Sequence, residues 1–341
     1  MLRKYLPRKF LGIYFLSLAI ASLLSFSVFR FIFTLPKQPS ICHRPSNFRK
    51  ITLNSVDEIA FITVPRPFMN GDIFERNKLA IHSWLSVSNS SRVLLFVNRT
   101  EYDPSGEFPN LLDKLYGPDR VKYLGYIKSD LNEVPYIDHW FIRGLQETES
   151  KYVCFINSDI VLSSTWLHRV KQVFISMKNK NVVMIGQRID FDLQKEKLST
   201  LNYGSKDFLK EIDRFVMNSY HEDHSPYRID TFTFRADNPP FNPEMIPPFI
   251  MGRYNWDNWL VGWLNTICDT VTFNLDPPIY HVNHERHNFD PEDNLVAIND
   301  RLRKANRNLF GSNYDTNWEI KDGKICSRLL PIRYDLPKIE D

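Results

Sequence analysis

The stretch of sequence that decides the fold is residues 151–162, which read KYVCFINSDIVL. The apolar run at 152–156 has the length and composition of a buried β-strand. It ends abruptly at Asn157, Ser158 and Asp159, and a second short apolar run follows at once. A carboxylate at the end of a buried strand is costly unless it meets a cation or several hydrogen-bond donors. Asp159 is therefore either a ligand to a hard cation such as Mg²⁺ or Mn²⁺, or the cap of the following turn.

Upstream of this stretch, β-rich runs alternate with segments of helical periodicity. We expect strands at 59–64, 92–97, 121–126, 152–156 and 182–186, and helices at 73–85, within 104–116, at 136–146 and at 164–177. This alternation predicts an α/β fold with a mainly parallel central sheet flanked by helices. Ligands of such sheets bind at the carboxyl ends of the strands. Three polar loops fall at these ends, at 65–66, 132–138 and 157–159.

The composition excludes several classes of protein. Gly is scarce, at 12 of 341 residues, and neither a GxGxxG nor a GxxxxGK[ST] phosphate loop occurs. The net charge of +3 is weak, and four basic residues near the N-terminus contribute much of it. The charge therefore argues against nucleic acid as a partner.

The N-terminus carries a targeting signal. Residues 10–29 hold no charge and are long enough to span a hydrocarbon core. The basic residues before them predict a cytosolic tail at 1–9, a lumenal stem at 30–57 and a lumenal domain at 58–341. The rival interpretation is a cleaved signal peptide, because residues 19–21 (AIA) resemble a cleavage site. Apolar residues continue beyond that point, which favours the uncleaved anchor.

Sequons and cysteines fit a lumenal body. Asn89 and Asn98 each begin an N-x-[ST] sequon and are predicted glycosylation sites. Cys154 lies inside an apolar strand and is expected to be a buried thiol. Cys268 and Cys326 could form a disulfide in an oxidising lumen, although the sequence leaves the pairing open.

A second polar constellation lies at residues 279–287, IYHVNHERH. His281, His284 and His287 recur at a spacing of three, on one face of a helix or along a loop. Neutral imidazole is a common metal ligand, whereas the simpler interpretation is a set of exposed histidines. A β-like run at 270–275 precedes them. One of these histidines could therefore return to a metal held by Asp159.

A third constellation is residues 251–263, MGRYNWDNWLVGW. Its apolar members have helical spacing and predict a packed helix face: Trp256, Trp259, Leu260 and Trp263. Asp257 lies one position off that face, near the start of the helix. It is either a helix cap favoured by the helix dipole, or a general base whose pKa is tuned by the aromatic surroundings.

Isolated charged residues give weaker signals. Arg66 and Arg188 could contact phosphate, or could form surface ion pairs. Asp230 lies on an alternating strand and could face a cleft. Asp190 and Asp192 fit a solvated strand face better than a site.

Taken together, these motifs resemble a glycosyltransferase of the GT-A type, and more narrowly a group of GT-A-like proteins related to family 2. The group's motifs occur in order over residues 58–290, as Asn132-Glu133-Val134-Pro135, Asn157-Ser158-Asp159-Ile160, Gly252 to Leu260 around Trp256-Asp257-Asn258-Trp259, and His281-Val282-Asn283-His284. The resemblance implies a GT-A, Rossmann-like fold after one N-terminal transmembrane helix, with a nucleotide-sugar half at 58–188 and an acceptor half at 189–341.

The resemblance also implies roles for single residues. Asp159 matches the last carboxylate of the family's DxD signature, whereas Asn157 stands where that signature has its first Asp. His284 or His281 matches a late histidine that completes the metal shell, and Asp257 matches the catalytic base of inverting members. The implied donor-binding set is Pro65, Arg66, Asn132, Asn157, Asp159 and Arg188, and the implied acceptor-binding set is Trp256, Asn258 and Asp230.

The implied activity is that of a single-pass type II membrane enzyme of the Golgi (or ER), a hexosyl- or pentosyltransferase. It would move a sugar from a nucleotide-diphosphate sugar to a glycan, glycoprotein or glycolipid, with Mn²⁺ or Mg²⁺. One alternative is a non-catalytic lumenal protein that binds a glycan or a partner enzyme on the same fold. Another is a zinc hydrolase built around His281, His284 and His287.

Overall fold

The computed structural model describes residues 41–43, 58–66, 71–130, 133–193, 198, 200–284 and 294–328. The expected membrane anchor at 10–29 lies outside these residues, as do Asn132 and His287. Within the described part of the chain, no helix combines the length and apolarity that crossing a membrane requires.

The first half of the described chain alternates strands and helices, as predicted. Its elements are β2 (Ile59–Thr63), α2 (Gly71–Ser86), β3 (Arg92–Leu95), α3 (Arg99–Tyr102), α4 (Glu107–Tyr116), β4 (Val121–Tyr123), α5 (Ile137–Glu147) and β5 (Tyr152–Ile156). Strands β5, β2, β3 and β4 pair in that order, and every pairing is parallel. Each parallel pair needs a crossover, which the intervening helices supply.

The second half is less regular. Its elements are β6 (Ile160–Leu162), α6 (Trp166–Ser176), β7 (Val182–Ile185), β8 (Arg188–Phe191), α8 (Phe208–Met217), β9 (His221–Asp223), β10 (Thr231–Arg235), the 3₁₀-helix η2 (Pro243–Met245), α9 (Trp256–Ile267), β11 (Asp269–Thr272), β12 (Ile279–Val282), α10 (Asn294–Ala305), β13 (Trp318–Lys321) and β14 (Lys324–Ser327). Near the other end of the chain, β1 (Ile41–His43) pairs with β14.

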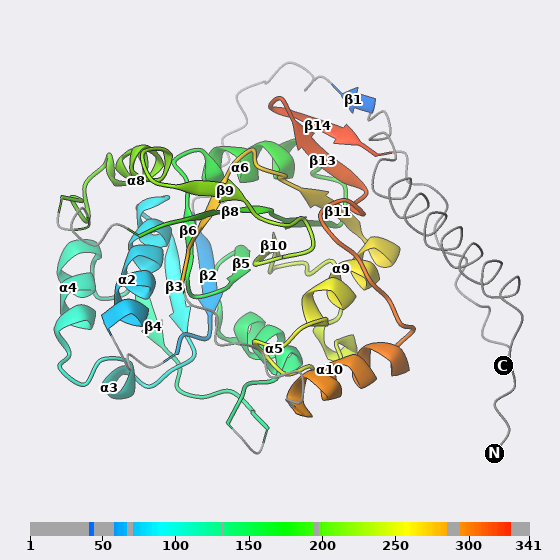
Figure 1. Cartoon of the computed structure of the whole chain (residues 1–341), viewed down its shortest axis with the longest axis horizontal. Coiled ribbons are helices and arrows are strands. Elements are labelled where there is room, and N and C mark those ends of the chain that lie inside the picture. Colours follow the sequence, from blue (N-terminus) through cyan, green and yellow to red (C-terminus); the bar gives the residue numbers. More distant parts are fainter. Residues whose placement is uncertain are drawn as a thin grey trace, which may run out of the picture. The chain divides into compact units, whose positions relative to one another are not determined.

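Among the described residues, ten strands form one central sheet, in the order β1-β14-β13-β11-β7-β10-β5-β2-β3-β4 (Figure 1). The prediction of an α/β fold with a large central sheet flanked by helices is confirmed. The sheet is more mixed than expected, because β10 runs antiparallel to both of its neighbours, β5 and β7. This reversed strand carries the chain after β9 back into the middle of the sheet.

A smaller sheet has the order β6-β12-β8-β9. Strand β6 begins only four residues after β5 ends, but it pairs with β12 instead of continuing in the central sheet. In this sheet His281 of β12 lies opposite Ile160 on one side and Asp190 on the other. The segment that contains the late histidines therefore includes a strand, and this strand brings His281 next to the residues that follow Asp159.

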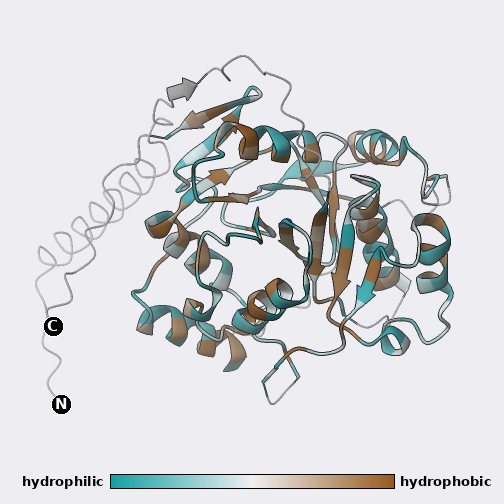
Figure 2. Ribbon diagram, turned by 180° about the vertical axis from the view of Figure 1, so that it is seen from behind, coloured by the Kyte–Doolittle hydropathy of each residue, from teal (hydrophilic) through white to brown (hydrophobic). Residues whose placement is uncertain are grey.

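Both faces of the central sheet are covered by other parts of the chain, and the strands of this sheet are strongly apolar (Figure 2). On one face, Phe61 of β2 stacks on Trp84 of α2. On the other, Phe155 of β5 stacks on Phe141 of α5, with the ring centroids 4.2 Å apart. Burial on both faces explains why these strands are continuous apolar runs without alternation.

The cysteines correct one prediction. Cys154 is a buried free thiol, as expected, but Cys268 is also free and Cys326 is disulfide-bonded. Cys268 directly precedes β11, and β13 lies between β11 and β14, the strand that carries Cys326. Two strand spacings are about 9–10 Å, too far for the Cα atoms of a disulfide. In the β1–β14 ladder, Cys42 is the residue opposite Cys326.

Candidate functional site

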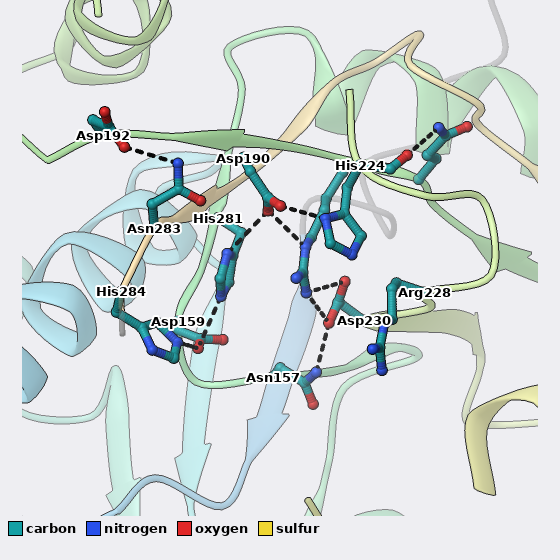
Figure 3. A network of polar contacts seen from close by, with 12 residues as sticks. Asn157, Asp159, Asp190, Asp192, His224, Arg228, Asp230, His281, Asn283 and His284 are labelled. Carbon is teal, nitrogen blue, oxygen red and sulfur yellow. Dashed lines mark hydrogen bonds and ion pairs between the residues drawn. The ribbon is translucent and has the colours of Figure 1, made fainter. Parts of the chain in front are cut away.

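Asp159 lies in the turn that carries the chain from β5 into β6. The turn is held by the backbone, because the amide of Asn157 donates to the carbonyl of Asp230 (3.1 Å) and that of Ile160 donates to the carbonyl of Asn157 (3.2 Å). The Asn157 side chain donates to the Asp230 carboxylate at 2.8 Å. The carboxylate of Asp159 instead faces two histidines (Figure 3).

Asp159, His281 and His284 form a convergent set of three potential ligands. Oδ2 of Asp159 lies 3.4 Å from Nε2 of His281 and 3.8 Å from Nε2 of His284. One ligand atom from each residue lies within 4.8 Å of the others, which makes them a group able to hold a metal ion. His281 is buried, whereas Asp159 and His284 remain partly open to solvent. The site can therefore accept a further ligand from outside.

His281 lies between two carboxylates. Its Nδ1 is 3.0 Å from Oδ1 of Asp190, on the side away from Asp159. Burial opposes ionisation of Asp159, but the charge and hydrogen bonding of His281, helped by His284, hold the pKa of that carboxyl well below its usual value. Burial would lower the pKa of His281, but Asp159 and Asp190 raise it overall.

A buried charge network continues from Asp190. Arg188 donates from Nε to Asp190 (2.9 Å) and from Nη1 to both oxygens of Asp230 (2.9 Å each). Nδ1 of His224 contacts the second oxygen of Asp190. This network of polar contacts therefore connects the β5–β6 turn, β8, β10 and β12 through their side chains as well as through the backbone. Arg188, predicted as a phosphate contact, is buried and binds two buried carboxylates.

Arg76 of α2 was not foreseen from the sequence. Burial lowers the pKa of its guanidinium, the negative charges of Asp159 and Asp72 raise it, and the nearby Arg66 lowers it. The half-buried Arg76 thus lies within electrostatic range of Asp159, and the exposed Arg66 lies within range of Arg76. Pro65 is buried. No motif marks Arg76, since the helical periodicity of α2 reports its buried face and not its polar one.

Asp257 is the second residue of α9 and lies next to the same network. Burial raises the pKa of its carboxyl to about 6. Hydrogen bonds from the backbone amides of Asn258 and Ile229 and the charge of Arg228 lower this pKa, whereas the charge of Asp230 raises it. Arg228 lies beside Asp230 in Figure 3. The sequence offered two alternatives for Asp257, a place at the start of the helix and a carboxyl with a shifted pKa. The structure combines the two.

The other predicted acceptor residues have packing contacts. Trp256 is buried against Trp140 and Phe232. The Asn258 side chain donates to the carbonyls of Tyr227 and Gly311 (2.9 Å each) and so holds two loops together beside Asp257.

The two sequons differ in accessibility. Asn89 is exposed, and Asn98 is half-buried at the start of α3. Both remain predicted glycosylation sites.

Comparisons with known proteins gave matches among solved structures but none among family models or curated proteins. No family model matches the chain, and no curated protein matches it. Among solved structures, the crystal structure of residues 1–349 of TarS from S. aureus is similar, with a TM-score of 0.39 and 12% sequence identity. The similarity covers 66% of this chain and 60% of the TarS chain.

Proposed function

We propose that this chain is a GT-A-type glycosyltransferase that moves a sugar from a nucleotide-diphosphate sugar to a hydroxyl of a glycan, glycoprotein or glycolipid. We further propose a type II anchor at residues 10–29 and a catalytic domain in the lumen of the Golgi or ER. The observation that carries the activity is the convergence of Asp159, His281 and His284 next to a second polar group that ends in Asp257. A metal site could stabilise the leaving diphosphate, and a carboxyl with a raised pKa could accept the proton of the attacking hydroxyl.

The donor side rests on the ligand set. One carboxylate and two imidazoles fit a divalent cation of the Mn²⁺ or Mg²⁺ kind, with Mn²⁺ favoured because imidazole is a poor ligand for Mg²⁺. When bound, the cation supplies positive charge against the leaving diphosphate. Arg76 and Arg66 add guanidinium groups, which bind phosphate through charge-assisted hydrogen bonds. The cation therefore does not have to neutralise the diphosphate alone.

The acceptor side rests on Asp257. A carboxyl with a pKa of about 6 is mostly ionised at pH 7, yet it is a better proton acceptor than an ordinary carboxylate. The acceptor oxygen attacks the anomeric carbon, the bond from that carbon to the phosphate oxygen breaks, and the acceptor proton passes to Asp257. Asp230 and Arg228 set the charge around this base.

The test is a panel of UDP- and GDP-sugars assayed for donor hydrolysis with Mn²⁺, which requires no knowledge of the acceptor. Asp159→Ala should abolish donor hydrolysis, and Asp257→Ala should reduce it by about 100-fold or more on the general-base scale. Asp237→Ala, at an exposed ion pair with Arg235, is a control that should keep full activity. Full activity in both site variants would refute the assignment.

Two further measurements identify the alternatives. A thermal shift with a nucleotide sugar and Mn²⁺, lost in Asp159→Ala but without turnover, identifies a binding protein on this fold. Stoichiometric zinc in the purified protein identifies the metal hydrolase.

A further inference from the structure

We propose that Asp190 is a positioning residue for the cation site: it fixes His281 in the tautomer that turns the Nε2 lone pair towards Asp159. This inference rests on the cation site of the proposed function. It assigns a role to a residue whose sequence context indicated only a solvated strand face.

Strand register brings the two side chains together. Strands β8 and β12 are parallel neighbours, and Asp190 lies directly opposite His281. Nδ1 of His281 is 3.0 Å from Asp190, and Nε2 is 3.4 Å from Asp159. A neutral imidazole carries one proton, so its Nε2 can bind a cation only if the proton is on Nδ1. A carboxylate that accepts this proton fixes both the tautomer and the ring orientation.

Asp190 is itself held in place from two sides. Arg188 donates to the same oxygen that faces His281, and His224 contacts the other oxygen. The side chain of Asp190 is only 3% exposed, so water does not compete for these contacts. Neither oxygen can turn away without breaking a buried contact.

The need to neutralise the charge of Arg188 does not by itself explain why a carboxylate is buried at position 190. Arg188 already contacts both oxygens of Asp230, each at 2.9 Å. Asp190 also contacts two histidines, His224 and His281. Because the second of these faces Asp159, the contact indicates a role directed at His281.

The test uses the full-length protein in detergent. Calorimetry measures its titration with Mn²⁺ alone. A second titration uses Co²⁺, whose visible absorption reports its ligands. Asp190→Asn keeps the size of the side chain and should weaken cation binding by about 10–100-fold, the usual effect of losing such an outer carboxylate. Asp190→Glu keeps the charge beside Arg188 and should bind more tightly than Asp190→Asn. Asp223→Asn, the same change at an exposed position of neighbouring β9, should bind as the wild type does.

A double-mutant cycle separates positioning from a general charge effect. If Asp190 acts through His281, Asp190→Asn should cost little further affinity in a His281→Gln background. Wild-type affinity in Asp190→Asn, or fully additive losses, would overturn the proposal. A wild-type chain that binds neither ion would overturn the cation site itself, and the positioning role with it.

Discussion

The pKa of the Asp257 carboxyl is raised, although the residue lies at the start of α9, where the helix dipole favours a negative charge. Burial outweighs the dipole and the two backbone donors and raises the pKa to about 6. Such a carboxyl costs the fold stability once it is ionised, which is a common feature of residues retained for chemistry.

This cost makes a prediction for Asp257→Asn. The folded-state pKa lies above the value of about 3.9 expected in the unfolded chain, so stability is lost as the pH rises towards 6 and the full cost persists above it. The variant should lose transferase activity, yet melt about 2–4 °C higher than the wild type at pH 8, the shift that roughly 1 kcal/mol produces. The difference should vanish near pH 4. Calorimetric melting at both pH values checks this, and a lower melting temperature at pH 8 would contradict it.

The neighbouring guanidinium of Arg228 leads to a second prediction for a single residue. Arg228 lowers the pKa of Asp257, and its guanidinium also lies 4.9 Å from the centre of the Tyr254 ring. Arg228→Gln should therefore raise the pKa of Asp257 and move the acid limb of the pH–rate profile to higher pH. Arg235→Gln, at the far end of β10, is the matched control and should leave the profile in place.

At the residue scale, the sequence pointed to candidate side chains where they stood inside a motif. Asp159, Asp257, His281 and His284 were singled out in this way. Asp190 and Arg76 were not, because one required the register of β8 against β12 and the other lies on the polar side of a helix. Nor does the sequence show that Arg188, predicted as a phosphate contact, is buried between two carboxylates.

At the scale of elements, α9 shows how the site is supported. Gly262 of α9 touches the backbone of the loop that contains Phe310 and Gly311, and a Cβ there would lie 2.9 Å from the Phe310 nitrogen. The same loop is bound to Asn258, the residue after Asp257. The small residue in α9 therefore allows this loop to pack beside the end of the helix that carries Asp257.

Gly262→Ala should destabilise the protein despite the higher helix propensity of alanine. The added methyl group meets backbone, which cannot swing away, and such overpacking costs about 1–3 kcal/mol. The lower urea midpoint at unchanged m-value should be measurable. Gly71→Ala is the control, since a Cβ at Gly71 meets nothing within 4 Å. Equal midpoints for the two variants would refute the packing argument.

The predicted elements agree with the structure wherever the pattern was local. The apolar runs became β2, β3, β5 and β7, and the Trp-rich segment became α9 with its buried face. The histidine segment was the exception: its spacing of three fitted a helix, but it contributes to β12 because β6 and β8 offer it two ladders of backbone hydrogen bonds. Tertiary pairing overrode local spacing there.

At the scale of the whole molecule, the candidate cation site exists only in the folded chain. Asp159 and His281 are 122 positions apart in the sequence, and three strands of the smaller sheet hold them together with Asp190. A ligand that binds only the folded state stabilises it by mass action.

Mn²⁺ should therefore raise the free energy of unfolding by about 2.7 kcal/mol at 100 times its dissociation constant. The increase should disappear in His281→Gln and after addition of EDTA. His168→Gln, at a histidine of α6 away from the site, is the control and should keep the full response. An Mn²⁺ response that survives in His281→Gln would place the cation elsewhere.

The sequence by itself determined the α/β class, most strands and helices, and the short list of polar residues at strand ends. These properties are local, because an apolar run and its period of 2 or 3.6 residues are present before any folding takes place. Only the tertiary structure decided that β10 reverses the sheet, that Cys268 stays free, and that Asp190, Arg188 and Asp230 join the site. Strand order and register are set by the combined burial of distant segments. They determine which carboxylate faces which histidine, and no stretch of the sequence holds that information alone.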